Sequence, residues 1–390
     1  LIKKANKRNI KIIVDGVFSH TGDDSIYFNR AGTYDSIGAC QSVKSPYYGW
    51  YKFTDWPTNY DCRYNIDIMP STDAGNVFFD EFITGHEGVI RTYTRLGIAG
   101  WKLDVCEQLP DAFIEHAVAA ARRENGDALV YGEVFHDATT LQSDGTKRNF
   151  LASGKLDSVT NYPFKEDILN FVRCGDSGRL NNTVGFIINN YPKRTVDSLM
   201  NVLGNHDTAR LMTVLGHYDS VYTRDDKAKA VLTDREEATR LVKMAAALQY
   251  TLPGIPCIYY GDEIGMEGFE DPFNRKCHMW GDGDKQLLKF YKCLGAVRTN
   301  ERDIFAHGAY NALDAEHGVM FFERVASKER VYVVVNNSGS DYPPAVPKGG
   351  YIDLMTYKPF DGTVKDKCVA IFKSEKTTVI PPNKQKKKKS

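Results

Sequence analysis

Several features that would mark a membrane or nucleic-acid-binding protein are absent from this sequence of 390 residues. It has no run of about 18 apolar residues, the length that a membrane-spanning helix requires. Its charge is balanced, because the number of Lys and Arg residues, 50, equals the number of Asp and Glu residues, 50. A formal charge of zero produces no field that would gather nucleic acid or an anionic membrane surface. We therefore expect no membrane and no nucleic-acid partner, and a substrate that is not recognised through bulk charge.

The sequence also lacks the short spacings by which many proteins hold zinc. Its eight cysteines are scattered without a CxxC pair, and neither HxH nor HExxH occurs. This pattern excludes the common short-spaced zinc sites. In a chain of this size, scattered cysteines favour reduced thiols in a cytoplasmic protein.

The two ends of the sequence differ in character from the rest. The first residues, LIKKANKRN, resemble the end of an amphipathic helix and include no initiator Met. We therefore expect further sequence upstream of Leu1, where any signal peptide would lie. The last residues, NKQKKKKS, are basic and of low complexity, and they predict a solvated, disordered tail over residues 383–390.

Between these ends, short apolar runs alternate with helical patterns, which is typical of βαβ units and a parallel sheet. The expected strands cover residues 10–14, 100–105, 128–131, 156–160, 198–203 and 255–260. The expected helices cover residues 77–96, 111–123, 164–171, 235–250 and 286–298. Six strand-and-helix units fall two short of a closed eightfold barrel.

Two segments depart from this alternation. Residues 21–76 are too long for a plain loop and hold the aromatic stretch SPYYGWYKFTDWPTNY, so we predict a small inserted domain. From residue 303 the pattern changes to short alternating strands, which favours a C-terminal β-sandwich up to residue 382. The barrel would then comprise residues 1–20 and 77–302.

Polar side chains stand where four of the apolar runs end. In a parallel barrel the carboxyl ends of all strands lie on one face, so these groups are expected to share a pocket. One Asp after a strand is usually a helix cap, but four such sites in register are hard to explain as caps. The residues are Asp15 and His20 in IIVDGVFSH, Asp104 in GWKLDV, Glu133 in LVYGEVFHD, and His206 with Asp207 in VLGNHDTAR.

Converging carboxylates are typical of a divalent metal site or of glycosyl transfer. The missing short-spaced His motifs disfavour the metal site. Glycosyl transfer needs one carboxylate as nucleophile and a second that is held protonated as general acid. Lys102 and Asp104 stand two apart in a strand and therefore point to the same face, where the lysine would keep the carboxylate ionised. The difference in pKa between two such carboxyl groups is produced by their mutual repulsion and by burial.

The motifs DGVFSH, GWKLDVCEQ, YGEVF and LGNHDTAR resemble, in order and spacing, the four signature regions of the α-amylase superfamily of glycoside hydrolases. The resemblance extends over residues 1–382 and includes IPCIYYGDEIGMEG and DPFNR. GWKLDVCEQLPD, LDSVTNYPF and MPSTD resemble most the neopullulanase, cyclomaltodextrinase and maltogenic amylase branch. The resemblance implies an α/β fold: a (β/α)8 TIM-type barrel, here without its first two strands, with an inserted small domain and a C-terminal β-sandwich.

The resemblance also implies an activity. Such an enzyme would hydrolyse α-1,4 bonds of maltooligosaccharides, cyclodextrins or pullulan with retention of configuration, as an α-glucan hydrolase that requires no cofactor. Loop carboxylates and asparagines leave room for a calcium ion, although no EF-hand-like loop occurs. Branch members often form a homodimer through an N-terminal domain that this sequence does not contain.

Carried over position by position, the resemblance assigns roles to the polar residues. Asp104 matches the nucleophile, Glu133 the general acid/base, and Asp207 the third carboxylate, which grips substrate hydroxyls. A general acid must be neutral in the free enzyme, so we expect the pKa of Glu133 to be raised by its like-charged neighbours. His20 and His206 match the histidines that bind the sugar, and Asp15 matches a supporting aspartate. Lys102, Arg210, Glu107 and Tyr64 complete the expected substrate-binding set. Glu107 is equally well explained as a helix-start residue, and the aromatics near Tyr64 as the core of the inserted domain.

Two departures from the family pattern bear on the chemistry. The family has arginine two residues before the nucleophile, where this chain has Lys102. A lost charge-assisted bond would lower the rate about ten- to a hundredfold, so we predict that Lys102→Arg raises kcat. The chain also has Asp61-Cys62-Arg63-Tyr64 where the branch has an aromatic-rich stretch. The alternatives are a non-catalytic relative with a carbohydrate- or partner-binding role and an incomplete piece of an enzyme; the presence of all three carboxylates argues against loss of function by drift.

Overall fold

The computed structural model describes residues 1–143, 146–152, 155–218, 221 and 223–375. The basic tail predicted for residues 383–390 lies outside the described residues. The chain divides into two compact units, Leu1–Thr160 and Asn161–Ser390.

A parallel sheet forms the centre of the first unit. Its strands are β1 (Ile13–Gly16), β4 (Gly100–Leu103), β5 (Leu129–Gly132) and β8 (Ser158–Val159), in that spatial order. The pairing is in register, with Gly16 opposite Leu103 and Leu103 opposite Gly132. The four strands predicted for this part of the chain are confirmed, with ends shifted by up to three residues. Their carboxyl ends therefore meet at one edge of the sheet.

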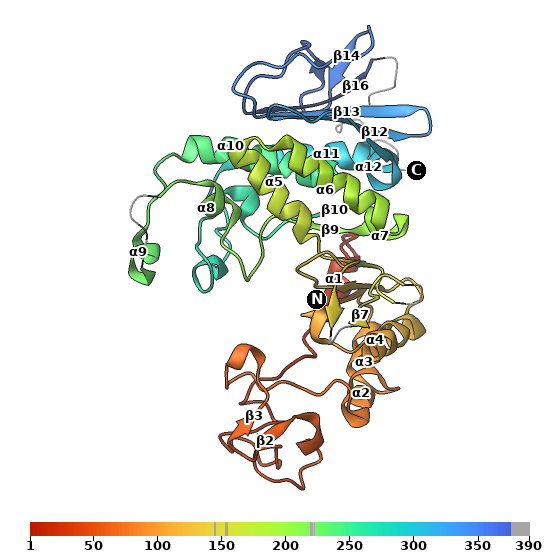
Figure 1. Ribbon diagram of the computed structural model, residues 1–390, viewed down its shortest axis with the longest axis vertical. Coiled ribbons are helices and arrows are strands. Elements are labelled where there is room, and N and C mark those ends of the chain that lie inside the picture. The colour runs from red at the N-terminus through yellow and green to blue at the C-terminus, as the bar shows by residue number, and fades with distance from the viewer. Residues whose placement is uncertain (144–145, 153–154, 219–220, 222, 376–390) are drawn as a thin grey trace. The chain divides into compact units, whose positions relative to one another are not determined.

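Helices α1 (Ile2–Asn6), α2 (Val77–Thr84), α3 (Val89–Arg95) and α4 (Asp111–Glu124) complete the first unit, and α2, α3 and α4 lie side by side in Figure 1. The single helix expected over residues 77–96 is two helices. Gly85 ends α2 in an extended conformation, and a Cβ there would lie 2.4 Å from the carbonyl oxygen of Glu81. The apolar side of α4 packs through Phe113 against Phe18, with ring centroids 6.0 Å apart. A small hairpin, β6 (Gln142–Ser143) and β7 (Thr146–Lys147), comes between β5 and β8 in the sequence.

The predicted insertion, residues 21–76, contains little regular structure. It holds the 3-10 turns η1 (Tyr48–Trp50) and η2 (Arg63–Asn65) and the two-stranded β2 (Phe53–Asp55) and β3 (Asn59–Tyr60). Phe28 is fully buried among Tyr51, Phe53 and Tyr60, with centroids 4.9, 5.8 and 4.7 Å away. Most of the aromatic stretch is therefore the segment's own core.

The second unit begins with helices around a pair of parallel strands, β9 (Met200–Val202) and β10 (Ile255–Cys257). Its helices are α5 (Tyr162–Cys174), α6 (Ser177–Asn190), α7 (Lys193–Ser198), α8 (Leu211–Leu215), α9 (Arg224–Lys229), α10 (Arg235–Thr251), α11 (Lys285–Asn300) and α12 (Arg302–His307). Sequence patterns predicted α5, α10 and α11. They missed α6, whose segment SGRLNNTVGFIINN is rich in residues that disfavour helix.

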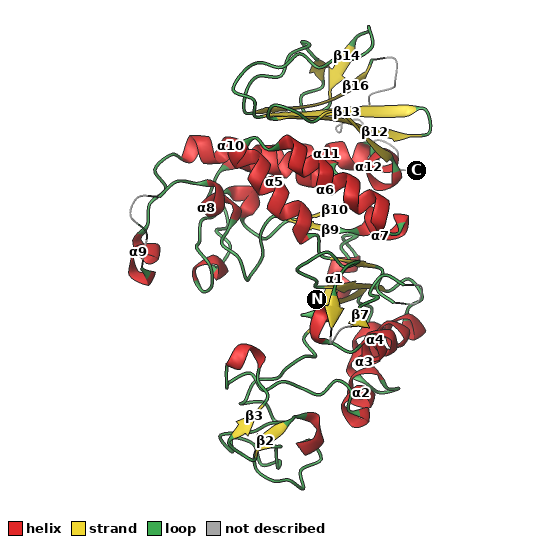
Figure 2. Ribbon diagram, viewed as in Figure 1, coloured by secondary structure: helices red, strands yellow, loops and turns green. Residues whose placement is uncertain are grey.

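Up to residue 375, the described C-terminal residues form one antiparallel sheet and not the two sheets of the predicted β-sandwich. Its strands are β11 (Ala309–Asp314), β12 (Val319–Ala326), β13 (Glu329–Asn336), β14 (Tyr351–Asp353), β15 (Lys358–Pro359) and β16 (Cys368–Ser374), in the order β11-β12-β13-β16-β14-β15. One face of the sheet packs against α10 and α12, as Figure 2 shows. The other face is covered by aromatic side chains of the same region, such as Phe360, whose ring centroid lies 4.2 Å from that of Phe372. In this described part, helices cover one face of the sheet, and loops with aromatic side chains cover the other.

The strands expected to form a barrel occupy two parallel sheets, one in each unit, and their closure into a barrel stays a prediction. None of the helices in the described parts of the chain has the length and apolar character needed to cross a bilayer.

Candidate active site

Asp104 and Glu133 lie next to each other at the carboxyl edge of the first sheet. The parallel ladder continues one residue past the strands, because Asp104 N donates to Gly16 O at 3.1 Å and Glu133 N to Leu103 O at 2.9 Å. Asp104 is 7% exposed and Glu133 2% exposed. The carboxylates predicted from two separate motifs are therefore neighbours in a buried site.

The turn after Asp104 is strained. Val105 has φ 42° and ψ 52°, a left-handed conformation that β-branched residues rarely adopt. Such a conformation costs on the order of 1–3 kcal/mol and persists only where its surroundings hold it. Cys106 N donates to Glu133 O at 3.0 Å, which ties this turn to the strand end that carries the second carboxylate.

Lys102 joins the carboxylates. Its Nζ lies 3.3 Å from Oδ1 of Asp104, 2.9 Å from Oε2 of Glu133 and 3.3 Å from Oδ1 of Asp15. The predicted common face of Lys102 and Asp104 is confirmed. Burial would lower the pKa of Lys102, but the three carboxylates outweigh it and raise the pKa, so the ammonium stays charged.

Arg63, which the sequence prediction did not place in the site, also binds Asp104. Its Nη1 donates to Oδ2 of Asp104 at 2.9 Å and lies 3.4 Å from Nδ1 of His20. The guanidinium comes from η2 in the inserted segment. The signal in the sequence was the departure at Asp61-Cys62-Arg63-Tyr64, which places an arginine where the branch has an aromatic-rich stretch.

The environment separates the acidities of the two carboxyl groups. Burial would raise the pKa of Asp104, but hydrogen bonds with Glu133 and Arg63 and the charge of Lys102 outweigh it and lower the pKa. The pKa of Glu133 is raised, chiefly by burial and further by Asp104, against the opposing effect of Lys102. The predicted direction for Glu133 is thus confirmed, but burial contributes more than the neighbouring negative charge that we had named.

His20 lies beside this pair. Its Nδ1 is 3.1 Å from the hydroxyl of Ser19, and the residue is partly exposed. Burial and the nearby Arg63 lower its pKa, with Asp104 opposing, so His20 is neutral at pH 7. A neutral imidazole next to the nucleophile can exchange hydrogen bonds with a sugar hydroxyl.

Glu107 and Tyr64 differ in their surroundings. An oxygen of Glu107 accepts a hydrogen bond from Phe135 N at 2.7 Å, so this carboxylate braces the loop that follows Glu133. That contact favours a structural role over a sugar contact. Tyr64 is 66% exposed and has a left-handed backbone, with φ 53°. Its ring is free to meet a ligand.

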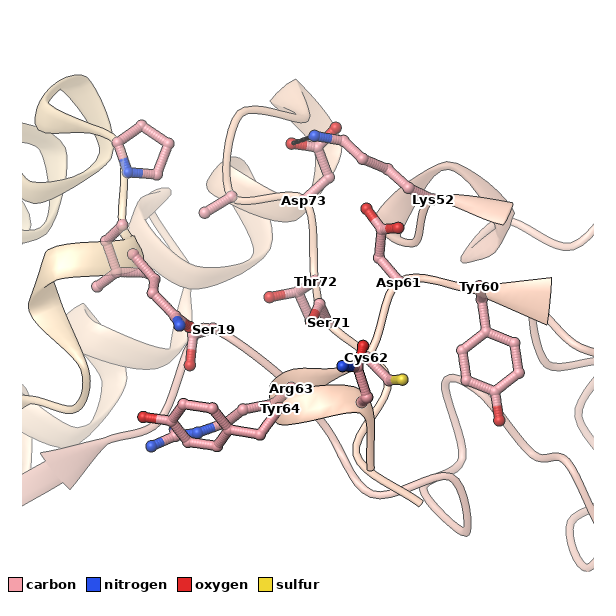
Figure 3. A pocket seen from close by; sticks show the side chains of 15 residues that line it. Ser19, Lys52, Tyr60, Asp61, Cys62, Arg63, Tyr64, Ser71, Thr72 and Asp73 are labelled. Atoms are coloured by element: carbon pink, nitrogen blue, oxygen red, sulfur yellow. Dashed lines mark ion pairs between the residues drawn. The ribbon is translucent and has the colours of Figure 1, made fainter. Parts of the chain in front are cut away.

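A cavity of about 470 Å³ opens beside η2 in the first unit (Figure 3). Arg63 and Tyr64 extend in the same direction along its wall, on the side where Ser19 lies, and a Lys52–Asp73 ion pair of 3.6 Å borders the other end. Most of the lining side chains are polar or charged, which suits a ligand rich in hydroxyl groups.

The second unit carries the other predicted site residues. His206 and Asp207 follow β9, with Nε2 and Oδ1 3.6 Å apart, and Arg275 lies 3.4 Å from the same oxygen. Asn274 was not predicted as a site residue, yet it is fully buried and its side-chain amide donates to the carbonyl oxygens of His206 and Thr208 at 2.7 and 2.8 Å. The DPFNR motif therefore holds the turn that presents Asp207.

Arg210 does not have the predicted role. Its side chain is 0% exposed, lies 4.0 Å from Asp262 and packs 4.6 Å from the ring centroids of Tyr259 and Tyr260. A group without exposed surface cannot touch a sugar, so its predicted contact with substrate is wrong. Arg210 is instead a buried cation that organises the segment after β10.

Within the described residues, no group of three or more His, Cys, Asp or Glu side chains is arranged to hold a metal ion. The carboxyl groups at the sheet edge are instead contacted by the cations Lys102 and Arg63. The arrangement thus sets apart two neighbouring carboxyl groups, one with a lowered and one with a raised pKa.

Comparison with known proteins agrees with this site. Residues 1–303 match the family described as the catalytic domain of α-amylase. The chain belongs to the α-amylase family of glycoside hydrolases. An amylopullulanase from Thermoanaerobacterium thermosulfurigenes is 31% identical over 92% of this chain and 21% of its own length. Neopullulanase 2 from Thermoactinomyces vulgaris is 28% identical over 93% of this chain and 58% of its own.

The structural comparison shows the same family fold. The debranching enzyme of Nostoc punctiforme superposes with a TM-score of 0.76 at 21% identity, covering 96% of this chain and 78% of that one. Such family members have a TIM-type barrel followed by a sheet domain. Other matching relatives are named cyclomaltodextrinase and maltogenic amylase, so the resemblance seen in the sequence is confirmed. The chain spans from about a fifth to three-fifths of the length of the curated relatives described here.

Proposed function

We propose that this chain hydrolyses α-1,4-glucosidic bonds of α-glucans by double displacement with retention of configuration. The observation that carries the proposal is the buried pair at the sheet edge, in which Asp104 has a lowered pKa and Glu133 a raised one. A retaining glycosidase needs an ionised nucleophile and a protonated general acid in one site.

In the first step, a carboxylate oxygen of Asp104 attacks the anomeric carbon. The bond from that carbon to the glycosidic oxygen breaks, and Glu133 gives its proton to the departing oxygen. In the second step, Glu133, now ionised, takes a proton from water as the water oxygen attacks the same carbon and releases Asp104. Two inversions restore the α configuration, and the reaction needs no cofactor.

The other predicted residues would bind the sugar. His20, beside the nucleophile, and His206 would contact its hydroxyl groups, and Asp207 would grip the two hydroxyls whose hydrogen bonds strengthen as positive charge develops on the ring. Asp15 supports the site through Lys102, 3.3 Å away. The exposed ring of Tyr64 would stack on a glucose unit in the adjoining cavity.

The substrate class follows from the relatives' names, which include amylopullulanase, neopullulanase and cyclomaltodextrinase. We propose maltooligosaccharides, cyclodextrins and pullulan. One relative is named an intracellular maltogenic amylase, in keeping with the proposed cytoplasmic location. Homodimerisation, expected for branch members, is likewise a proposal.

The test is release of reducing ends from soluble starch, pullulan and β-cyclodextrin, with the anomeric form of the first product followed by proton NMR. We expect release from at least one of them, with the α-anomer formed first. Asp104→Asn serves as the matched control, because it keeps the shape of the nucleophile and removes its charge. Initial release of the β-anomer would refute double displacement. No release by a folded chain would favour the non-catalytic, carbohydrate-binding alternative.

A further inference from the structure

We propose that Arg63 is a positioning residue that supplies the nucleophile with the guanidinium missing at position 102. This inference rests on the proposed function, because it assigns Asp104 the role of nucleophile. It adds a residue from outside the signature motifs to the reaction centre.

The contacts of Asp104 divide between two cations. Lys102 binds Oδ1 at 3.3 Å, while Nη1 of Arg63 donates to Oδ2 at 2.9 Å. The shorter bond is therefore the one made by arginine. Arg63 and Asp104 are both largely removed from solvent, with 12% and 9% of their side chains exposed. A charge-assisted bond in such surroundings is stronger and better oriented than one in water.

Lys102 alone is poorly suited to fix the nucleophile. Its single ammonium group is shared with Glu133 at 2.9 Å and Asp15 at 3.3 Å, and the bond to Asp104 is no shorter than these. An ammonium is a point charge on a flexible stem, whereas a guanidinium is a planar group with donors in fixed directions. Lys102 thus neutralises the cluster, and Arg63 sets the direction of one oxygen of Asp104.

The backbone of Arg63 is held firmly enough for this role. Arg63 N donates to Met69 O at 2.9 Å, and the preceding Cys62 forms a bridge with Pro70. Thr21 N in turn donates to Pro70 O at 3.1 Å, which connects η2 to the segment following β1. The guanidinium also lies 5.1 Å from the ring centroid of Tyr64. These contacts limit the freedom of the side chain before any substrate binds.

The experiment is a double-mutant cycle in the full chain with Arg63→Gln, Lys102→Arg and the double variant. We expect Arg63→Gln to lower kcat about ten- to a hundredfold with little change in KM, because the lost bond acts on the nucleophile and not on the substrate. Lys102→Arg should restore most of kcat in the Arg63→Gln background. Lys102→Arg alone, which the sequence predicts to raise kcat, should raise it by a smaller factor than it does in the Arg63→Gln background.

Arg30→Gln is the matched control. Arg30 lies in the same inserted segment and pairs with Asp23 and Asp67 at 3.3 and 3.1 Å, but its side chain is 43% exposed. The substitution Arg30→Gln removes the same charge from the segment without affecting a contact of Asp104. We expect its kcat to equal that of the unmodified chain, so that loss in Arg63→Gln alone reports the contact with the nucleophile.

A second readout does not depend on turnover. In protein labelled with carbon-13 at the Asp carboxyl groups, the resonance of Asp104 is identified by its absence in Asp104→Asn. Its pKa should rise in Arg63→Gln and return toward the original value in the double variant. If no substrate is cleaved, the proposed function fails while this measurement still tests the contact.

Three outcomes would overturn the inference. A pKa of Asp104 that is unchanged in Arg63→Gln would show that the guanidinium does not act on the nucleophile. A kcat that rises in Arg63→Gln would show that Arg63 obstructs the site. Failure of Lys102→Arg to restore either property would count against the exchange between the two positions.

Discussion

Replacing Lys102 by methionine removes one charge from the centre of three carboxylates and keeps most of the length of the side chain. Lys102 contacts Asp104, Glu133 and Asp15, and only 16% of its side chain is exposed. Removing one partner of a buried pair costs about 3–5 kcal/mol, because the remaining charge stays buried without compensation. Arg63 still neutralises Asp104, so we expect a loss near the lower limit, about 3 kcal/mol at pH 8.

The loss should depend on pH. Burial already raises the pKa of Glu133 above its usual value, and removing the lysine raises it further. A raised carboxyl pKa means that stability is fully present below the unfolded value, about 4.3, and is lost as pH rises through the folded value. This decrease in the free energy of unfolding with rising pH is larger in Lys102→Met than in the unmodified chain. The difference in unfolding free energy between Lys102→Met and the unmodified chain should therefore shrink from pH 8 to pH 5.

Urea unfolding followed by tryptophan fluorescence measures this difference. Three of the four tryptophans, Trp50, Trp56 and Trp101, belong to the first unit, so the signal reports mainly on the unit that contains the change. Lys52→Met is the control, since its ion pair with Asp73 is 3.6 Å long and the lysine is 63% exposed; it should cost less than about 1 kcal/mol. A loss in Lys102→Met that equals the control, or that does not vary with pH, would refute the reasoning.

Three further predictions concern other residues. In the pH profile, kcat/KM should fall on the alkaline side as Glu133 loses its proton and on the acid side as Asp104 gains one. Glu133→Gln should lower kcat about 10²- to 10⁴-fold and remove the fall on the alkaline side. Asn274→Ala removes two buried hydrogen bonds from the turn that carries Asp207, and should lower the free energy of unfolding by about 1–3 kcal/mol and raise KM, measured by thermal unfolding and initial rates. Burial raises the pKa of Asp262 to about 7. Its contribution to stability, on the order of 4 kcal/mol, is therefore present below about pH 4 and lost as pH rises through 7. The melting temperature of Asp262→Asn relative to the unmodified chain should be higher at pH 8 than at pH 5, and an equal difference at both pH values would contradict this assignment.

The sequence predicted the parallel strands and the two neighbouring carboxylates because both depend on local pattern. Apolar runs of fixed period mark strands, and a parallel register carries the residues after Leu103 and Gly132 to one edge. The pairing of Lys102 with Asp104 follows from the alternation of side chains in a strand. These inferences need no knowledge of which distant segments meet.

The contact between Arg63 and Asp104 could not be predicted in this way, because 41 residues separate them and η2 has no periodic pattern. The burial of Arg210 was missed for a similar reason: a charged residue next to a catalytic motif is usually exposed, and its neighbours Tyr259 and Tyr260 come from a later segment. The C-terminal strands were recognised, but their pattern does not reveal whether a second sheet or helices cover the buried face. Tertiary contacts decide each of these points.

The position of Arg63 in the inserted segment has a consequence for protein engineering. Loops of this kind are the parts that are most readily exchanged between related enzymes to alter substrate preference. In this chain such an exchange would also remove the guanidinium bound to Oδ2 of Asp104. A chimera that receives a relative's segment should therefore receive arginine at position 102 with it, since Arg63 in the loop and Lys102 in the strand both contact the same carboxylate.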